Sequence, residues 1–265
     1  MSLSVHDLHV KLASTHVLKG IDFVVNPGER IAILGPNGCG KSTLLRTLCS
    51  ILRPMEGEVR LDDRPLKTFR RRERAVRIGL LSQADVVPMM TTVRDHVAIG
   101  RHPHRRYFND RVTQDAAFID AAIELCEIGH LVDRPVERLS GGERQRVRLA
   151  TLLAQSPAIM LLDEPLTGLD LEHQYALLHL LEDLTADDQR TVLVVLHDLD
   201  IAMRFFDRLL IIDDGRLVAD GPPEEGMTPG LLREVFRIHA RIGEEPRSRQ
   251  PVIICERQRP AGGGD

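Results

Sequence analysis

The sequence lacks an excess of charge of either sign. Its 265 residues include 35 lysines and arginines against 39 aspartates and glutamates, a formal net charge of −4. Without a basic surplus there is no electrostatic reason to expect nucleic acid as a partner. The one local run of arginines, within residues 70–74, is expected to form a solvated helix face. We therefore expect no nucleic acid among the partners.

Cysteine is scarce, with Cys39, Cys49, Cys126 and Cys255 scattered along the chain. No Cys-x-x-Cys pair occurs, so the spacing of a zinc site or of a small disulfide-bonded domain is missing. This usage is typical of a reducing compartment, and we expect the protein in the cytosol.

Long hydrophobic runs are also missing. The longest, such as Thr191–Leu196, are far shorter than the ~20 apolar residues that span a bilayer. The first residues show no basic region followed by an apolar core, so we expect no signal peptide. Any role at a membrane would then be carried out through a partner.

The first sixty residues are predicted to be rich in strands around one helix. Leu3–Val10 and Ile21–Val25 have the β-branched content of strands. Arg30–Leu34 is a short apolar run that predicts a buried strand. Leucines at helical spacing predict a helix over Lys41–Ile51.

The chain changes character at residues 84–135, where β-branched runs become rare. Thr113–Ile128 places its apolar residues on one face of a helix. A further helix is predicted to begin at Ser140, because Ser140 and Glu143 have the spacing of a capping box. We expect a helical insert over about 84–150.

Strand patterns return in the last part of the chain. Ile159–Leu162 and Thr191–Leu196 predict buried strands, and Arg208–Asp213 with Arg216–Ala219 predicts a hairpin. The tail after Gly243 is rich in Arg, Gln, Pro and Gly and is expected to fray at its end.

The predicted strand, glycine-rich loop and helix surround the pattern Gly-x-x-x-x-Gly-Lys-Ser. Glycines let backbone N–H groups turn inward around phosphate oxygens, and the helix aims its positive end at the same charge. Lys41 would supply a cation, and the Ser42 hydroxyl would bind Mg²⁺. The alternative, an ordinary glycine turn, is disfavoured by the flanking elements. The candidate ATP contacts are Gly35, Pro36, Asn37, Gly38, Cys39, Gly40, Lys41, Ser42 and Thr43.

Polar residues follow other apolar runs. In open parallel sheets ligands bind at the carboxyl ends of strands, so Asp163 would orient Mg²⁺ through water and Glu164 would polarise the attacking water. The His197 imidazole could hydrogen-bond a γ-phosphate oxygen, and Gln83 could contact Mg²⁺ and water. Each has a simpler alternative when taken alone: an exposed acidic pair, a structural histidine, or a polar loop residue.

Ser140, Gly141 and Gly142 offer free N–H groups and a hydroxyl to an anion at a helix start. Because the chain already has one complete phosphate loop, this second site suggests a γ-phosphate presented by another subunit. The alternative is a helix cap, which Ser140 and Glu143 would satisfy unaided.

Together these residues resemble the ATP-binding cassette (ABC) ATPase superfamily over about residues 3–240. The resemblance is to Walker A at Gly35–Ser42, the Q-loop at Gln83, the signature motif at Leu139–Glu143, Walker B with its catalytic glutamate at Ile159–Glu164, the D-loop at Leu166–Asp170 and the switch histidine at His197.

The resemblance implies an α/β fold with a RecA-like mixed sheet core, an N-terminal antiparallel β subdomain and an inserted helical subdomain. The implied division is one ABC ATPase domain over 1–243, with its nucleotide-binding core at 1–83 and 151–243 and the helical subdomain at 84–150. A partly flexible tail, 244–265, would follow.

Finer features resemble the importers of iron–siderophores, haem and vitamin B12. They are Thr92-Val93-Arg94-Asp95, Gly100-Arg101-His102-Pro103-His104, Leu171-Glu172-His173-Gln174 and His197-Asp198-Leu199. The resemblance implies a peripheral homodimer at the cytoplasmic face of the inner membrane, coupled to a permease and, indirectly, to a periplasmic or lipoprotein substrate-binding protein. The helical insert would receive the permease, and hydrophobic and histidine residues within 86–104 would line that surface. A soluble ABC-type ATPase without transport is the alternative.

One residue departs from the family pattern. Members usually carry an aromatic residue that stacks on adenine, and Leu12 stands at that position. Base–aromatic stacking is worth ~1–3 kcal/mol in nucleic-acid complexes. We therefore predict weaker discrimination of adenine than is usual for the family.

Overall fold

The computed structural model describes residues 1–82, 91–105, 112–188, 190–246 and 251–256. Gln83, a predicted catalytic and Mg²⁺-contacting residue, lies outside the described residues. The described helices are α1 (Lys41–Leu48), α2 (Arg71–Arg77), α3 (Val93–Ile99), α4 (Val112–Leu125), α5 (Gly141–Gln155), α6 (Leu171–Asp188), α7 (Leu199–Phe205), α8 (Pro223–Gly226) and α9 (Pro229–Glu234), with 3₁₀ turns at η1 (Leu66–Thr68), η2 (His102–His104), η3 (Gly129–Leu131) and η4 (Val136–Arg138).

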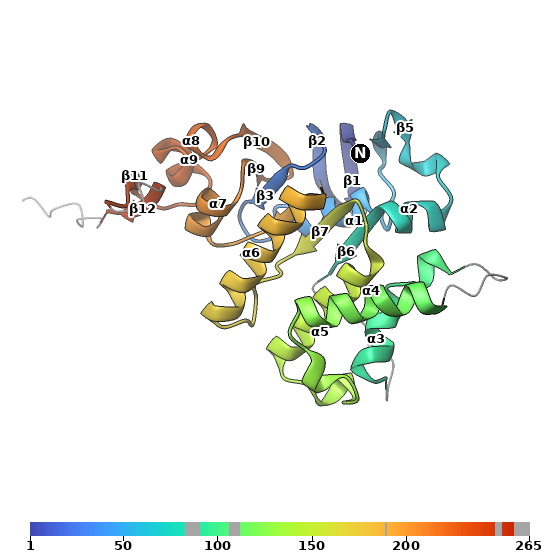
Figure 1. The fold of residues 1–265 in the computed structure, drawn as a ribbon. Coiled ribbons are helices and arrows are strands. Elements are labelled where there is room, and N and C mark those ends of the chain that lie inside the picture. The colour runs from blue at the N-terminus through green and yellow to red at the C-terminus, as the bar shows by residue number, and fades with distance from the viewer. Residues whose placement is uncertain (83–90, 106–111, 189, 247–250, 257–265) are drawn as a thin grey trace, which may run out of the picture.

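A six-stranded mixed sheet forms the centre of the molecule (Figure 1). In order across the sheet its strands are β10 (Arg216–Gly221), β9 (Arg208–Asp213), β3 (Arg30–Leu34), β8 (Thr191–Val195), β7 (Ile159–Asp163) and β6 (Ile78–Leu81). All neighbours pair in parallel except β10, which runs antiparallel to β9. The predicted strands and the predicted hairpin are confirmed.

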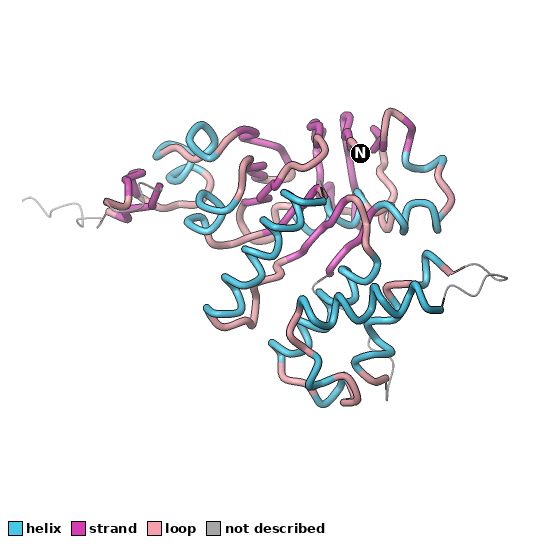
Figure 2. The backbone as a smooth tube through the Cα atoms, in the orientation of Figure 1, coloured by secondary structure: helices cyan, strands magenta, loops and turns pink. Residues whose placement is uncertain are grey.

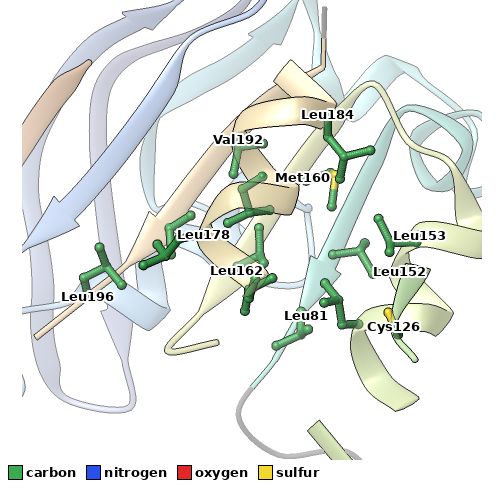
Figure 3. Close-up of a cluster of buried hydrophobic side chains, with 14 of the residues drawn as sticks. Leu81, Cys126, Leu152, Leu153, Met160, Leu162, Leu178, Leu184, Val192 and Leu196 are labelled. Atoms are coloured by element: carbon green, nitrogen blue, oxygen red, sulfur yellow. The ribbon is translucent and has the colours of Figure 1, made fainter. Parts of the chain in front are cut away.

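Successive residues of these strands alternate between two buried clusters. In β7, Met160 and Leu162 belong to one cluster, and Ile159 and Leu161 belong to the other. Figure 3 shows the first cluster, where side chains of β7 and β8 meet leucines of α6. The second cluster joins the sheet to α1 and to the N-terminal strands. Because both faces are covered, these strands have continuous apolar sequences.

A four-stranded antiparallel sheet packs on the α1 side of the central sheet. Its order is β2 (Thr15–Val25), β1 (Leu3–Leu12), β4 (Glu56–Leu61) and β5 (Arg64–Pro65). Strand β2 begins six residues earlier than the sequence predicts, because it pairs with β1 directly after the turn at residues 13–14. The arginine run lies on α2, where no residue is buried, as expected for a solvated face.

Helices α3, α4 and α5 pack together below the central sheet in Figure 2. The helix predicted over Thr113–Ile128 is present as α4, but it ends at Leu125, and Glu127 beyond it has a left-handed φ of 53°. Helix α5 runs on to Gln155, past the expected subdomain boundary at residue 150. That boundary remains a prediction.

The chain beyond Gly243 contains a strand that the sequence analysis did not identify. Strand β12 (Pro251–Cys255) pairs antiparallel with β11 (Ala240–Glu244). Its apolar Val-Ile-Ile run was the available signal, but polar and proline-rich neighbours obscured it. Within the described residues, no helix combines the length and the apolar character that crossing a bilayer requires.

Candidate functional site: a phosphate loop at the sheet edge

The glycine-rich loop connects β3 to α1 and is organised around Lys41. The Lys41 ammonium group donates to the carbonyl oxygens of Gly35 at 2.7 Å and Pro36 at 2.9 Å. Its side chain is buried, although it begins a helix at the edge of the sheet. The loop therefore holds the Lys41 ammonium group through its own carbonyl oxygens, beside the N–H groups that begin α1.

Two glycines of the loop are required by the space around them. At Gly35, which has φ of 145°, an added Cβ would lie 2.0 Å from the carbonyl oxygen of Ile212. At Gly40, with φ of 113°, it would lie 2.7 Å from Leu18 Cδ2. Gly38 also has a positive φ, 79°, but an added Cβ would meet nothing within 4 Å in the described chain. The loop conformation thus depends on close packing against β2 and β9.

Ser42 and Asp163 meet at the centre of this edge. The Ser42 hydroxyl donates to Asp163 Oδ1 at 2.9 Å, and Asp163 is the last residue of β7. Burial raises the pKa of the Asp163 carboxyl, and the bond from Ser42 opposes that rise. A hydroxyl and a carboxylate are hard oxygen donors of the kind that Mg²⁺ prefers. The donor set on this side therefore fits that ion.

Glu164 and His197 are brought together by the parallel strands β7 and β8. Asp163 pairs with Val195, so the residues that follow each strand emerge side by side. His197 Nε2 lies 2.6 Å from Glu164 Oε1, at hydrogen-bonding distance. The His197 side chain is 47% exposed and that of Glu164 is 18% exposed. A carboxylate and an imidazole thus face solvent together beside the phosphate loop.

The backbone of Glu164 is strained. Its φ of 53° is left-handed, a region that costs a non-glycine residue of order 1–3 kcal/mol and that clusters at functional sites. This left-handed conformation changes the direction of the chain directly after β7.

The start of α5 is a complete capping box, as predicted. Ser140 Oγ accepts from the Glu143 N–H at 3.3 Å, and Glu143 Oε2 accepts from the Ser140 N–H at 2.8 Å. An added Cβ on Gly141 would meet nothing within 4 Å in the described chain, and one on Gly142 would have ordinary contact with Gly168 O at 3.4 Å. The polar groups of the capping box are therefore hydrogen-bonded to each other, and the space around Gly141 is free of other described residues.

A buried hydrogen bond ties α5 to the segment that follows Glu164. The Gln145 side-chain amide donates to the carbonyl oxygen of Pro165 at 3.0 Å. Sequence reasoning missed Gln145, because only the fold brings the first turns of α5 next to residues 165–169.

Leu12 is the last residue of β1, paired with Thr15 across the hairpin turn. It is 39% exposed. Nearby on β2, Val17 contacts the glycine loop, since an added Cβ at Gly40 would reach Val17 Cγ1 at 3.3 Å. The predicted adenine-contacting residue is thus on the hairpin that borders the loop.

Two side chains of the Gly100–His104 segment bond to the end of α5. Arg101 is buried and donates to the carbonyl oxygen of Ala154 at 2.7 Å, and it forms an ion pair with Asp115. His104 Nε2 lies 2.8 Å from the carbonyl oxygen of Gln155, and burial lowers its pKa. Helix ends leave carbonyl groups that need donors. Arg101 and His104 therefore cap α5, while His102 beside them is exposed, and the permease surface expected within residues 86–104 remains a prediction.

The fold and this site define a nucleotide-binding P-loop protein, and comparison with known proteins gives its family. The family model for ABC transporters matches residues 18–167. Ferric enterobactin transport ATP-binding protein FepC from Escherichia coli (strain K12) is 41% identical over 238 residues, which cover 90% of this chain and 88% of FepC. Hemin import ATP-binding protein HmuV from Pseudomonas entomophila (strain L48) is 40% identical and covers 95% of this chain and 99% of HmuV.

Solved structures agree with the sequence comparison. A metal-chelate-type ABC transporter in an inward-facing conformation matches with a TM-score of 0.82 and 27% identity, covering 97% of this chain and 98% of that one. The chain therefore belongs to the ABC transporter family, and it is an ABC-type ATPase. The expected α/β ABC ATPase fold and the resemblance stated from the sequence are both confirmed.

Proposed function

We propose that this chain is the ATP-hydrolysing subunit of an importer for a metal chelate, such as an iron–siderophore, haem or cobalamin-type compound. The names of FepC and HmuV refer to ferric enterobactin transport and hemin import, and both align along most of the chain. A separate permease would carry the cargo, delivered by a substrate-binding protein, and the ATPase would act at the cytoplasmic face of the inner membrane. These relatives do not favour a soluble ATPase without transport.

ATP would bind with its phosphates in the loop of residues 35–43. Lys41 and the N–H groups at the start of α1 would neutralise the β- and γ-phosphate charge. Mg²⁺ would be held by Ser42, with Asp163 acting through water, and it would neutralise negative charge on the phosphates. The resemblance adds Gln83 as a further contact to Mg²⁺ and water, and Leu12 as the residue beside adenine.

The observation that carries the catalytic assignment is the contact of His197 with Glu164 at 2.6 Å. In the proposed mechanism Glu164 orients a water molecule and accepts its proton as the water attacks the γ-phosphorus, while the bond from that phosphorus to the bridging oxygen breaks and ADP leaves. With ATP bound, the N–H of His197 would donate to a γ-phosphate oxygen instead of to Glu164, which leaves the Glu164 carboxylate free to accept the proton of the water. General-base catalysis of this kind contributes ~10²–10⁴-fold.

A second copy of the chain would complete the site. Ser140, Gly141 and Gly142 would receive the γ-phosphate of the partner copy, head to tail, so that a homodimer encloses two nucleotides. Gly141 is exposed, and nothing in the described chain lies within 4 Å of a Cβ added there, which supports the approach of a partner at this helix start.

Glu164→Gln tests the proposal, because it keeps the size of the side chain and removes the base. In proteoliposomes that hold the ATPase with its permease, contain ATP and have the substrate-binding protein outside, we expect ATP hydrolysis to fall by ~10²–10⁴-fold. Uptake of the metal chelate should stop with it. The variant should still bind ATP and elute as an ATP-loaded dimer in size-exclusion chromatography.

Glu172→Gln, an exposed carboxylate in the first turn of α6, is the matched control and should behave like the wild type. Hydrolysis by Glu164→Gln near the wild-type rate would show that Glu164 is misassigned. Normal hydrolysis by the wild-type complex with no uptake of a ferric siderophore, hemin or cobalamin would contradict the import function.

A further inference from the structure

The C-terminal hairpin is bonded directly to the helix that follows His197. The backbone N–H of Ile253, in β12, donates to Asp200 Oδ1, in α7, at 2.8 Å. Figure 1 shows β11 and β12 beside α7, at the end of the molecule away from α3 and α4. A segment more than fifty residues further along the chain thus holds the first turn of α7.

Helix α7 begins immediately after His197, so its position fixes the backbone there. Asp198 caps the helix by accepting from the Ile201 N–H at 2.9 Å, and its carbonyl oxygen accepts from the Ala202 N–H at 3.1 Å. His197 therefore has little freedom to move unless the first turn of α7 moves with it.

The two ends of α7 are held by different parts of the protein. At its last residue the Phe205 ring packs edge-on against Tyr175 and His179 of α6, with ring centroids 5.8 and 5.7 Å apart. At its first turn the hydrogen bond from Ile253 supplies an anchor outside the central sheet. Leu199 and Ile201 of the same turn pack against the larger buried cluster, and the bond from Ile253 adds a polar anchor that comes from the C-terminal hairpin.

The hairpin itself is fixed to the core. Ile242 of β11 and Ile253 of β12 pack against the larger buried cluster, and the Glu256 N–H donates to the carbonyl oxygen of His239 at 2.8 Å. A hydrogen bond from a strand that is paired with β11 and partly packed on the core can hold Asp200 in one place. A bond from a loosely attached tail could not.

We infer that the β11–β12 hairpin positions His197 through Asp200, which acts as a positioning residue and does not touch the reacting atoms. The inference rests on the proposed catalytic role of His197. Its physical basis is the short contact between His197 and Glu164, since hydrogen bonds weaken steeply when distance and angle change. Misplacing a catalytic group by about 1 Å can cost as much as ~10²-fold in rate.

The test compares Asp200→Ala with Asp200→Asn in the full chain, each with His197 present and in a His197→Ala background. Asp200→Ala removes the acceptor and should lower kcat about three- to tenfold with little change in KM for ATP, because binding at the loop is untouched. Asp200→Asn keeps an oxygen acceptor and should retain most of the activity. Hydrolysis is measured in single-turnover experiments, which can resolve the slow rates expected in the His197→Ala background.

The coupling between the two sites decides the outcome. If Asp200 acts through His197, Asp200→Ala should lower the rate little or not at all once His197 is alanine. An equal loss in both backgrounds, or an unchanged kcat in Asp200→Ala, would overturn the inference. Glu234→Ala, on the exposed surface of α9, controls for nonspecific effects, and thermal unfolding reports any loss of folded protein.

His197→Ala alone separates this inference from the proposed function. If that variant hydrolyses ATP at the wild-type rate, the catalytic assignment itself fails. If it is slow while Asp200→Ala is normal, the assignment of His197 stands and only the role of the hairpin is rejected.

Discussion

The two glycine-rich segments of this protein look alike in sequence but are constrained differently in the structure. In the phosphate loop, Gly35 and Gly40 have left-handed backbones, and an added Cβ would collide with β9 or β2. At the start of α5, Gly141 and Gly142 are helical, and an added Cβ would meet open space or ordinary contact in the described chain. Packing inside the protein explains why Gly35 and Gly40 are glycines, but it does not explain Gly141 and Gly142.

The glycines at the start of α5 therefore need a reason other than packing within the chain. Glycine inside a helix costs up to about 1 kcal/mol relative to alanine, so two glycines at the start of α5 weaken the helix without relieving a clash in the described chain. A bare helix start is useful when another molecule must approach its N–H groups closely. The contrast therefore supports the proposed approach of a partner copy at Gly141 and Gly142.

Gly35→Ala should have the largest effect, through folding. The new Cβ would lie 2.0 Å from a backbone carbonyl oxygen in a left-handed conformation, and strain with overpacking together cost roughly 3–5 kcal/mol. Urea unfolding measures the loss. Gly38→Ala, with a positive φ but open space, is the matched control and should cost only about 1–2 kcal/mol. Equal losses in the two variants would break the comparison, because they would show that packing against β9 is unimportant.

The sequence was sufficient for the elements around this loop, because local signals determine them. Continuous apolar runs predicted β3, β7 and β8, and the capping box located the start of α5. The rule that ligands bind at the carboxyl ends of parallel strands then gathered Asp163, Glu164 and His197 at one edge. Their spatial proximity could be predicted without knowing any side-chain contact.

The remaining features depend on contacts between distant segments, which spacing does not reveal. The bonds of Arg101 and His104 to the last carbonyl groups of α5 cross about fifty residues of sequence and could not be predicted from it. The bond from Ile253 to Asp200 crosses 53 residues of sequence, and the strand that provides it lies in a stretch of tail-like composition. Such partners are selected by packing of the whole chain, and local propensity carries no information about them.

Gly141→Ala should stabilise the protein, whereas Gly35→Ala should destabilise it, and this contrast sharpens the comparison of the two segments. Alanine favours the helix, so we expect the free energy of unfolding to rise by up to about 1 kcal/mol in urea. The added methyl group should still block the approach of a partner, so the ATP-loaded dimer of a Glu164→Gln background should be lost in size-exclusion chromatography. A variant that is more stable and still forms this dimer would contradict the proposed role of the helix start.

The smallest effect concerns the pH dependence of the same helix start. Glu143 accepts hydrogen bonds from Ser140, which lowers the pKa of its carboxyl below the usual range. A carboxyl with a lowered pKa in the folded state stabilises the protein above its unfolded pKa, about 4.3 for glutamate, and this contribution is lost as pH falls through the folded pKa. Glu143→Gln keeps an acceptor but does not titrate, so its thermal stability should fall less than that of the wild type between pH 6 and pH 3. The difference should be small because the carboxylate is exposed and screened by solvent, and identical pH profiles would mean that the capping box contributes nothing through charge.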